Sequence, residues 1–256
     1  LGNQMFEYCR FRDLMESGHD EVYLFYDHRR LKQHNGLRLS DCFELELPSC
    51  PWGVKLVVWG LKICRAVGVL KRLYDDEKPE AVLIDDYSQH RRFIPNARRY
   101  FFFRQFLAEL QSGFVQMIRA VDYPVSVHVR RGDYLHPSNS SFGLCGVDYF
   151  QQAIAYVRKK RPDARFFFFS DDMEWVRENL WMEDAVYVEH TELLPDYVDL
   201  YLMTLCRGHI ISNSTFSFWG AYLAVDGNGM KIYPRRWFRD PTWTSPPIFS
   251  EEWVGL

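Results

Sequence analysis

Several common sequence patterns are missing from this chain of 256 residues. It has no apolar run of the roughly 18 residues that a membrane-spanning helix requires, and no signal peptide is visible. Its six cysteines are scattered without a Cys-x-x-Cys pair, which favours free thiols in a reducing compartment over a zinc site or a disulfide framework. No Asp-x-Asp occurs, and the side chains of adjacent Asp pairs diverge on a strand, so we expect no metal ion.

The charge and composition are those of an ordinary globular protein. A formal net charge of −3 argues against nucleic acid as a partner, because binding to a phosphate backbone normally needs a basic face. With 47% hydrophobic and 25% charged residues, the chain is long enough for one large or two small domains. We expect a cytoplasmic protein. Peripheral association with a membrane and an anchor upstream of residue 1 are both compatible with the sequence.

The most informative stretch is residues 125–134, Val-Ser-Val-His-Val-Arg-Arg-Gly-Asp-Tyr. Its alternating valines predict a buried strand that begins after Pro124 and ends at Gly132. The end of this strand and the following turn carry His128, Arg130, Arg131 and Asp133. Arginine side chains there suit a phosphate, because guanidinium groups pair bidentately with its oxygens. A charged turn without a ligand is the alternative interpretation.

Strands and helices alternate in the second half of the chain, which indicates right-handed crossovers and a parallel sheet. Expected strands are residues 125–129, 165–169, 185–188, 208–212 and 231–233, and expected helices are 148–160, 172–180, 195–206 and 215–225. The first half is less regular. There we expect helices at residues 4–17 and 98–117 and strands at 21–26 and 82–84. Residues 54–73 form a basic amphipathic segment, for which a packed helix is favoured over one resting on an anionic membrane.

Four ordered segments resemble motifs of glycosyltransferase family 11, the α-1,2-fucosyltransferases. They are residues 1–6 (Leu-Gly-Asn-Gln-Met-Phe), 128–133 (His-x-Arg-Arg-x-Asp), 169–180 and 211–221. The resemblance runs from residue 1 to about residue 238, and residues 28–80 match nothing recognisable. It departs at Phe218, where the family usually has tryptophan.

The resemblance implies an α/β fold of two Rossmann-like domains facing across a cleft, the GT-B arrangement, with the first strand preceding residue 1. We therefore expect an N-terminal, acceptor-side domain at residues 1–123. A GDP-fucose-binding domain would follow at 124–238, and a C-terminal tail at 239–256.

Transfer of fucose from GDP-fucose builds negative charge on the β-phosphate as the sugar leaves. Without a metal ion, protein cations and oriented amides must neutralise that charge, and Arg130 is the best candidate. The fourth motif lies between a strand and a helix, where free backbone amides favour anions. Its predicted contacts to the donor come from Asn213, Ser214, Thr215 and Ser217. The alternative is that Ser214 or Thr215 only caps the helix.

The remaining candidates lie in the first three motifs. Related fucosyltransferases imply that His128 and Asp171 (or Asp172) read the guanine edge, with Ser170 beside them. The alternative for Asp171 is a helix cap that pairs with Glu174. Gly2, Asn3 and Gln4 precede a helix and are predicted to approach the diphosphate or the fucose.

The general base is not fixed by the sequence. Asp133 is a candidate by position, although it could only orient Arg130 or cap the turn; Glu7, Asp13, Glu192 and Asp196 are further candidates. The leading hypothesis is an inverting, metal-independent fucosyltransferase that uses GDP-fucose and a glycan acceptor. The alternatives are a fucosyltransferase of different linkage or acceptor, and a non-catalytic protein that binds sugar nucleotides or glycans.

Overall fold

The structure is a computed structural model that describes residues 1–19, 21–26, 36–66, 87–110, 113–136, 141–189 and 194–256. It divides into two compact units, Leu1 with Asn3–Phe102 and Gly2 with Phe103–Leu256. The sequence placed the domain boundary after residue 123. In the structure α5 (Gln105–Ala108) and α6 (Gly113–Arg119) precede that point and yet belong to the second unit.

The described residues of the first unit form helices and irregular segments. They form most of α1 (Gly2–Glu16), then α3 (Leu39–Cys42), α4 (Trp52–Ala66) and two 3-10 helices, η2 (Arg91–Phe93) and η3 (Ala97–Arg99). The core includes Phe43 and Phe101, whose ring centroids lie 4.9 Å apart. The helix predicted at residues 4–17 is confirmed as α1. No helix in the described ranges is long and apolar enough to cross a membrane.

Two predictions for the first half change in the structure, and a third is not tested. Residues 21–26 form no strand, and the segment is held instead by the Tyr26 hydroxyl, which donates to the Gln4 carbonyl oxygen at 2.9 Å. The helix expected at residues 98–117 is broken into η3, α5 and α6. Aromatic packing explains the first break, because Phe101 is buried against Phe43 and cannot continue a helical turn. The strand expected at residues 82–84 lies outside the described residues.

The second unit contains an open, all-parallel sheet of six strands, a Rossmann-like arrangement. The strands are β1 (Tyr123–Val129), β2 (Ala164–Ser170), β3 (Val186–Tyr187), β4 (Gly208–Ile210), β5 (Lys231–Tyr233) and β6 (Val254–Gly255). Their order is β3-β2-β1-β4-β5-β6. The prediction of a parallel α/β sheet is therefore confirmed. Residues 239–256, predicted as a tail, belong to this unit and end in its edge strand β6.

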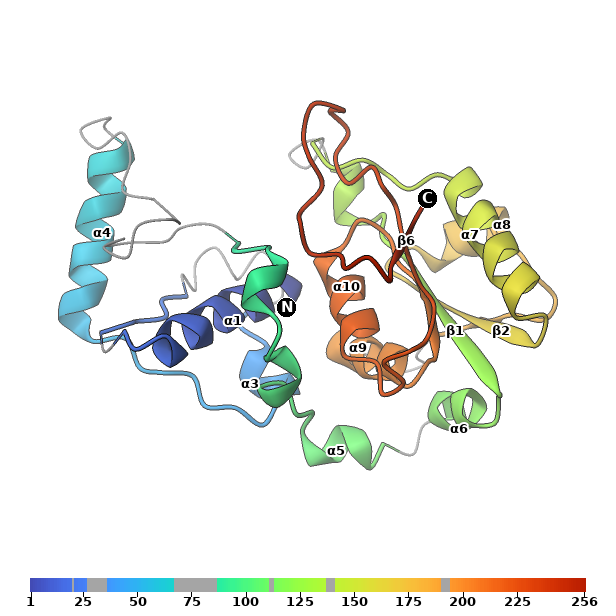
Figure 1. Cartoon of the computed structure of the whole chain (residues 1–256), viewed down its shortest axis with the longest axis horizontal. Helices are drawn as coiled ribbons and strands as arrows, with labels where there is room; N and C mark the ends of the chain where they lie inside the picture. Colours follow the sequence, from blue (N-terminus) through green and yellow to red (C-terminus); the bar gives the residue numbers. More distant parts are fainter. Residues whose placement is uncertain (20, 27–35, 67–86, 111–112, 137–140, 190–193) are drawn as a thin grey trace. The chain divides into compact units, whose positions relative to one another are not determined.

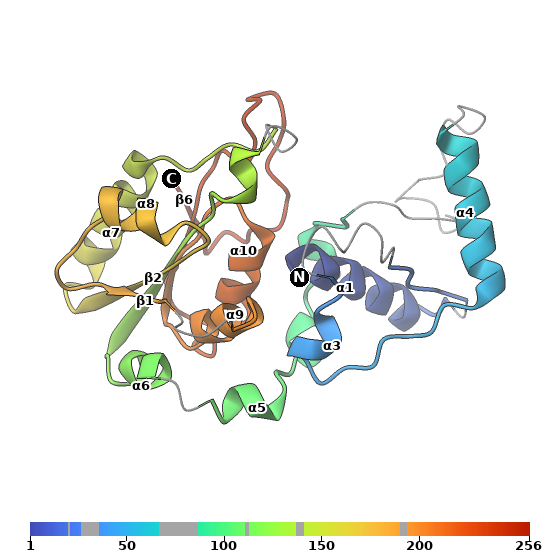
Figure 2. The ribbon, with the colours of Figure 1, turned by 180° about the vertical axis from the view of Figure 1, so that it is seen from behind.

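Helices cover both faces of this sheet. Helices α7 (Val147–Lys160) and α8 (Met173–Asn179) lie on one face, and α9 (Tyr197–Thr204) and α10 (Thr215–Tyr222) lie on the other (Figures 1 and 2). Double coverage explains why β2 is a run of four buried phenylalanines, residues 166–169, instead of an alternating strand.

The strand order creates a switch point at the centre of the sheet. From β1 the chain winds outward to β2 and β3 and then returns to β4 on the other side of β1. The loops after β1 and β4 therefore run to opposite faces at the carboxyl edge, which in open α/β sheets is the place of a ligand-binding crevice.

Candidate active site at the switch point

The two central strands are joined by a hydrogen bond at their carboxyl ends. His128 is the residue before the end of β1, and Ser212 follows β4. The Nδ1 atom of His128 lies 3.0 Å from the hydroxyl oxygen of Ser212. Burial, together with the nearby positive charge of Arg130, lowers the pKa of His128 to about 3. The imidazole is therefore neutral at physiological pH and serves as a hydrogen-bonding group, not as a cation.

Arg130 lies at the mouth of the crevice and pairs with Asp171. Its Nη1 is 3.1 Å from Asp171 Oδ2, and the two side chains are 32% and 26% exposed. Asp171 Oδ1 also accepts the backbone N–H of Arg131 at 2.9 Å. Because the pair is partly exposed, an incoming anion can reach the guanidinium group and share it with the carboxylate.

Gly132 is required by the close approach of Asp171. A Cβ atom at Gly132 would lie 2.7 Å from Asp171 Oδ2, closer than such atoms come in proteins. The absence of a side chain at this position thus lets the carboxylate lie against the turn after β1. Gly132 was read from the sequence only as the end of the strand, and the structure gives it a part in building the site.

Arg131 points elsewhere, as expected for the strand neighbour of Arg130. Its Nε donates to Asp172 Oδ2 at 3.0 Å, and its guanidinium carbon lies 4.0 Å from the centroid of the Trp175 ring. The side chain is only 16% exposed. These contacts attach the turn after β1 to the start of α8. The predicted contact between Arg131 and the donor stays a prediction.

The cap of α8 is Asp172, not Asp171. Asp172 Oδ1 accepts the backbone N–H of Trp175 at 3.2 Å, so the pairing of Asp171 with Glu174 as a capping box was wrong. Ser170 supports this turn, since its hydroxyl donates to the Val129 carbonyl oxygen and accepts the Asp172 N–H, both at 2.9 Å. Asp171 is thereby left to face Arg130, which removes the helix-cap alternative.

Two side chains of the fourth motif make hydrogen bonds inside the protein. The buried Asn213 side chain donates to the carbonyl oxygens of Gly143 at 2.6 Å and Trp237 at 2.8 Å, so its amide holds two other loops in place. The Ser217 hydroxyl is also buried and donates to the Ser214 carbonyl oxygen at 3.1 Å. The positions of these two residues explain the shape of the loop, and their predicted contacts to the donor stay predictions.

Ser214 occupies the N-cap position of α10 without a capping hydrogen bond from its side chain. Ser214 is thus the N-cap by position, as the alternative interpretation had it, but its hydroxyl does not cap a backbone amide of the helix. Its backbone is extended, and α10 begins at Thr215, so the first-turn amides of the helix point toward the carboxyl edge of the sheet. A serine hydroxyl next to these amides is a typical arrangement for an anion.

Gly2 belongs to the second unit and packs at the same helix start. Its carbonyl oxygen accepts the indole N–H of Trp219 at 2.9 Å, and a Cβ atom there would lie 2.5 Å from Thr215 Oγ1. Only glycine fits so close to the start of α10.

Three predicted residues are tested less directly. Asn3 and Gln4 belong to the first unit, where Asn3 Oδ1 accepts from Gln89 at 3.0 Å and Gln4 donates to the Gly36 carbonyl oxygen at 2.8 Å. Asp133 begins the 3-10 helix η4 (Asp133–Leu135), and its side chain lies outside what the structure describes. The roles of all three stay predictions.

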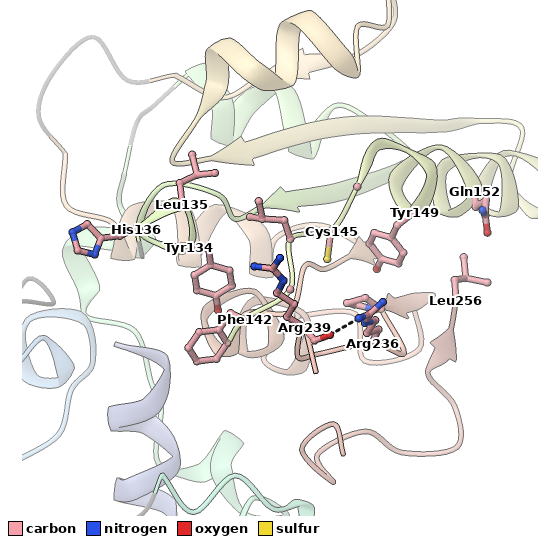
Figure 3. Close-up of a pocket in the computed structure, with 14 residues that line it drawn as sticks. Tyr134, Leu135, His136, Phe142, Cys145, Tyr149, Gln152, Arg236, Arg239 and Leu256 are labelled. Atoms are coloured by element: carbon pink, nitrogen blue, oxygen red, sulfur yellow. Dashed lines mark hydrogen bonds between the residues drawn. The ribbon is translucent and has the colours of Figure 1, made fainter. Parts of the chain in front are cut away.

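A cavity of about 820 Å³ lies beside the fourth motif (Figure 3). Tyr134 connects it to the crevice, because its hydroxyl donates to the Asn213 carbonyl oxygen at 2.9 Å and its ring centroid lies 6.0 Å from the Arg130 guanidinium carbon. The Tyr134 ring stacks on Phe142 at 4.9 Å. Arg236 and Arg239 also line the cavity, and none of its described lining residues is Asp or Glu.

The composition of this cavity suits a sugar ring or an anionic group, through aromatic faces and guanidinium groups. The sequence analysis missed it. Tyr134 ends the most informative stretch and could have been included, whereas no pattern singles out Arg236 or Arg239. Within the described ranges, no three His, Cys, Asp or Glu side chains gather closely enough to hold a metal ion.

Comparison with known proteins gives consistent matches. The family described as Glycosyl transferase family 11 matches residues 96–256. An O-antigen biosynthesis glycosyltransferase, WbnK, from Escherichia coli is 36% identical over 134 residues, covering 51% of this chain and 44% of that protein. An alpha-1,2-colitosyltransferase from Escherichia coli is 27% identical over 279 residues, covering 100% of this chain and 96% of that protein.

A galactoside 2-alpha-L-fucosyltransferase from Bos taurus is 34% identical over 142 residues, covering 52% of this chain and 38% of that protein. The matched part thus spans less than half the length of the WbnK and bovine proteins and nearly all of the colitosyltransferase.

Proposed function

Because the chain belongs to glycosyl transferase family 11, we propose that it transfers L-fucose from GDP-fucose to a hydroxyl group of a glycan. The accepting group is the 2-OH of a terminal galactose, in line with the name of the bovine galactoside 2-alpha-L-fucosyltransferase. The observation that carries the proposal is the position of Arg130 at the switch point, partly exposed and next to the start of the loop that leads from β1.

The chemistry follows from where charge develops. As the bond between fucose and the β-phosphate breaks, negative charge grows on the phosphate oxygens. Arg130 neutralises it from the β1 side, and the first-turn amides of α10 with the Ser214 hydroxyl do so from the β4 side. These groups lie on adjacent strands that are joined by the His128–Ser212 hydrogen bond, so their spacing is fixed before the donor binds.

Guanine is read by Asp171 and His128 in this proposal. The Asp171 carboxylate accepts from the N–H and amino groups of the base, and the neutral imidazole of His128 contributes a hydrogen bond without competing charge. What supports this assignment is that Asp171 is not used as a helix cap. When the donor binds, the Asp171 carboxylate contacts both Arg130 and the guanine base.

The reaction is proposed to be inverting and independent of metal. Arg130 and the helix start supply the positive charge that a metal ion would otherwise bring. The acceptor hydroxyl attacks the fucose carbon from the side opposite to the leaving GDP, and Asp133, directly after the arginine pair, takes its proton. The first unit contributes the acceptor side of a two-domain GT-B arrangement in this account.

A second candidate is transfer of a different sugar. The colitosyltransferase is the relative covered over nearly its whole length, which favours colitose as an alternative sugar. An assay with GDP-fucose, GDP-colitose, GDP-mannose and UDP-galactose on a panel of galactosides separates the two. Turnover of GDP-fucose well above the other donors supports the first candidate, and preference for GDP-colitose supports the second. Turnover of UDP-galactose alone contradicts both.

A further inference from the structure

Helix α4 carries an apolar stripe that faces solvent. Trp52, Leu56, Trp59 and Ile63 are spaced by four, three and four residues, which places them on one face of a helix. Their exposed fractions lie between 50% and 74%. Large apolar side chains are normally turned toward the core, so a complete exposed stripe marks a binding surface.

The buried side of α4 is small by comparison. Val58 is the one side chain of this helix that is buried among those described, with 7% exposure. The interpretation favoured from the sequence, a packed helix with a solvated basic face, is therefore wrong for the stripe. Figures 1 and 2 show α4 at the margin of the first unit, apart from α1 and α3.

Basic residues lie next to the stripe. Lys55 and Lys62 are one position away from Leu56 and Ile63, on the same flank of the helix. The Nζ of Lys62 also lies 5.6 Å from the centroid of the Phe25 ring. The sequence of α4 contains no Asp or Glu, so the charge beside the stripe has a single sign.

We propose that α4 lies flat on an anionic lipid surface, with its stripe in the boundary between headgroups and acyl chains. Tryptophan prefers that boundary, because its ring is apolar and its N–H can still reach water or a headgroup. The ammonium groups of Lys55 and Lys62 bind the lipid phosphates at the level of the headgroups. The described part of this helix, Trp52–Ala66, has 15 residues, fewer than the roughly 20 that cross a bilayer, in keeping with a surface orientation.

The stripe can be tested with two neighbouring residues. Leu56 and Val57 are 55% and 56% exposed, but they lie about 100° apart around the helix, and only Leu56 belongs to the stripe. In flotation of the full chain with vesicles of phosphatidylcholine and phosphatidylglycerol, Leu56→Ser should weaken binding about tenfold. Val57→Ser is the matched control and should bind like the wild type. Far-UV circular dichroism checks that both keep α4.

The charge requirement is tested separately. Binding should be strong with phosphatidylglycerol, weak with phosphatidylcholine alone, and reduced by salt, because salt screens exposed charges. The double substitution Lys55→Glu and Lys62→Glu should lower affinity for the anionic vesicles on the order of a hundredfold.

Two outcomes would overturn the proposal. One is absence of binding to anionic vesicles at low salt. The other is concentration-dependent dimerisation that Leu56→Ser abolishes while vesicle binding persists, which would make the stripe a contact between two copies. Sugar transfer to a soluble acceptor should be the same in the Leu56→Ser variant as in the wild type, so this test is independent of the proposed function.

Discussion

Arg130 and Arg131 are adjacent in sequence, and the structure gives them different tasks. Arg130 is a third exposed and pairs with Asp171, whereas Arg131 is only 16% exposed, packs on Trp175 and pairs with Asp172. Replacing each by alanine should separate catalysis from stability. The comparison has a built-in control, because both variants lose one positive charge from the same turn.

The magnitudes follow from these contacts. A partly exposed ion pair such as Arg130–Asp171 contributes about 0–1 kcal/mol to the free energy of unfolding. In the transition state, losing one preorganised charge-stabilising donor costs about 10²–10³ in kcat. Arg131→Ala removes a charge-assisted hydrogen bond and a stacked guanidinium group, which together cost about 2–4 kcal/mol of unfolding free energy. Its kcat should stay near that of the wild type when the protein is folded.

Two measurements on each variant decide the matter: kcat for transfer from GDP-fucose, and the free energy of unfolding in urea. We also expect Arg130→Lys to restore little activity, because an ammonium group cannot make the two-pronged contact. If Arg130→Ala kept near-normal turnover while folded Arg131→Ala lost it, the assignment of the phosphate-binding arginine would be refuted.

Three further predictions concern metal, the base-reading carboxylate and pH. Activity should survive excess EDTA; complete loss that manganese restores would contradict the metal-free proposal. Asp171→Ala should weaken GDP binding by calorimetry while the Tm of the unliganded protein barely changes, and the reverse pattern would assign Asp171 a purely structural part. Burial lowers the pKa of His209 to about 3, below the 6.5 of an unfolded histidine, so its contribution to stability is complete above pH 6.5 and is lost as the pH falls toward 3. Replacing it with Asn should reduce the slope of unfolding free energy against pH, between pH 4 and 6, by about 1.4 kcal/mol per unit; an unchanged slope would mean that His209 is not held neutral.

The second half of the fold was predictable because its signals are local. Strands β1 to β4 are short runs rich in apolar residues, each followed by a turn and a helix, and β1, β4 and β5 lie close to where the sequence placed them. The strand order and the short edge strand β6 were not predictable in this way, since they depend on contacts between distant segments. In the first half, the prediction of one continuous helix was wrong where aromatic packing interrupts the helix, as at Phe101.

The candidate site, too, could be predicted from the sequence only in part. The meeting of Arg130 with Asp171 follows from the rule that carboxyl ends of parallel strands share one edge. The residue that caps α8 depends on the backbone geometry of one turn. The spacing of Asp171 and Glu174 suggested Asp171, but the cap is Asp172. Asn213 is predicted to contact the donor because it is polar and lies in a motif, and that stays a prediction. Its use as an internal link to Gly143 could be seen only from the folded chain.

The most direct test of the central claim is the identity of the product. The purified chain would be incubated with GDP-fucose carrying ¹³C at the anomeric carbon and with a soluble β-galactoside, in the presence of EDTA, and the product would be examined by NMR. The account predicts an α-linked fucose whose anomeric carbon shows a three-bond correlation to the proton at position 2 of galactose. A product with the anomeric configuration of the donor, or release of free fucose without any transfer, would contradict it.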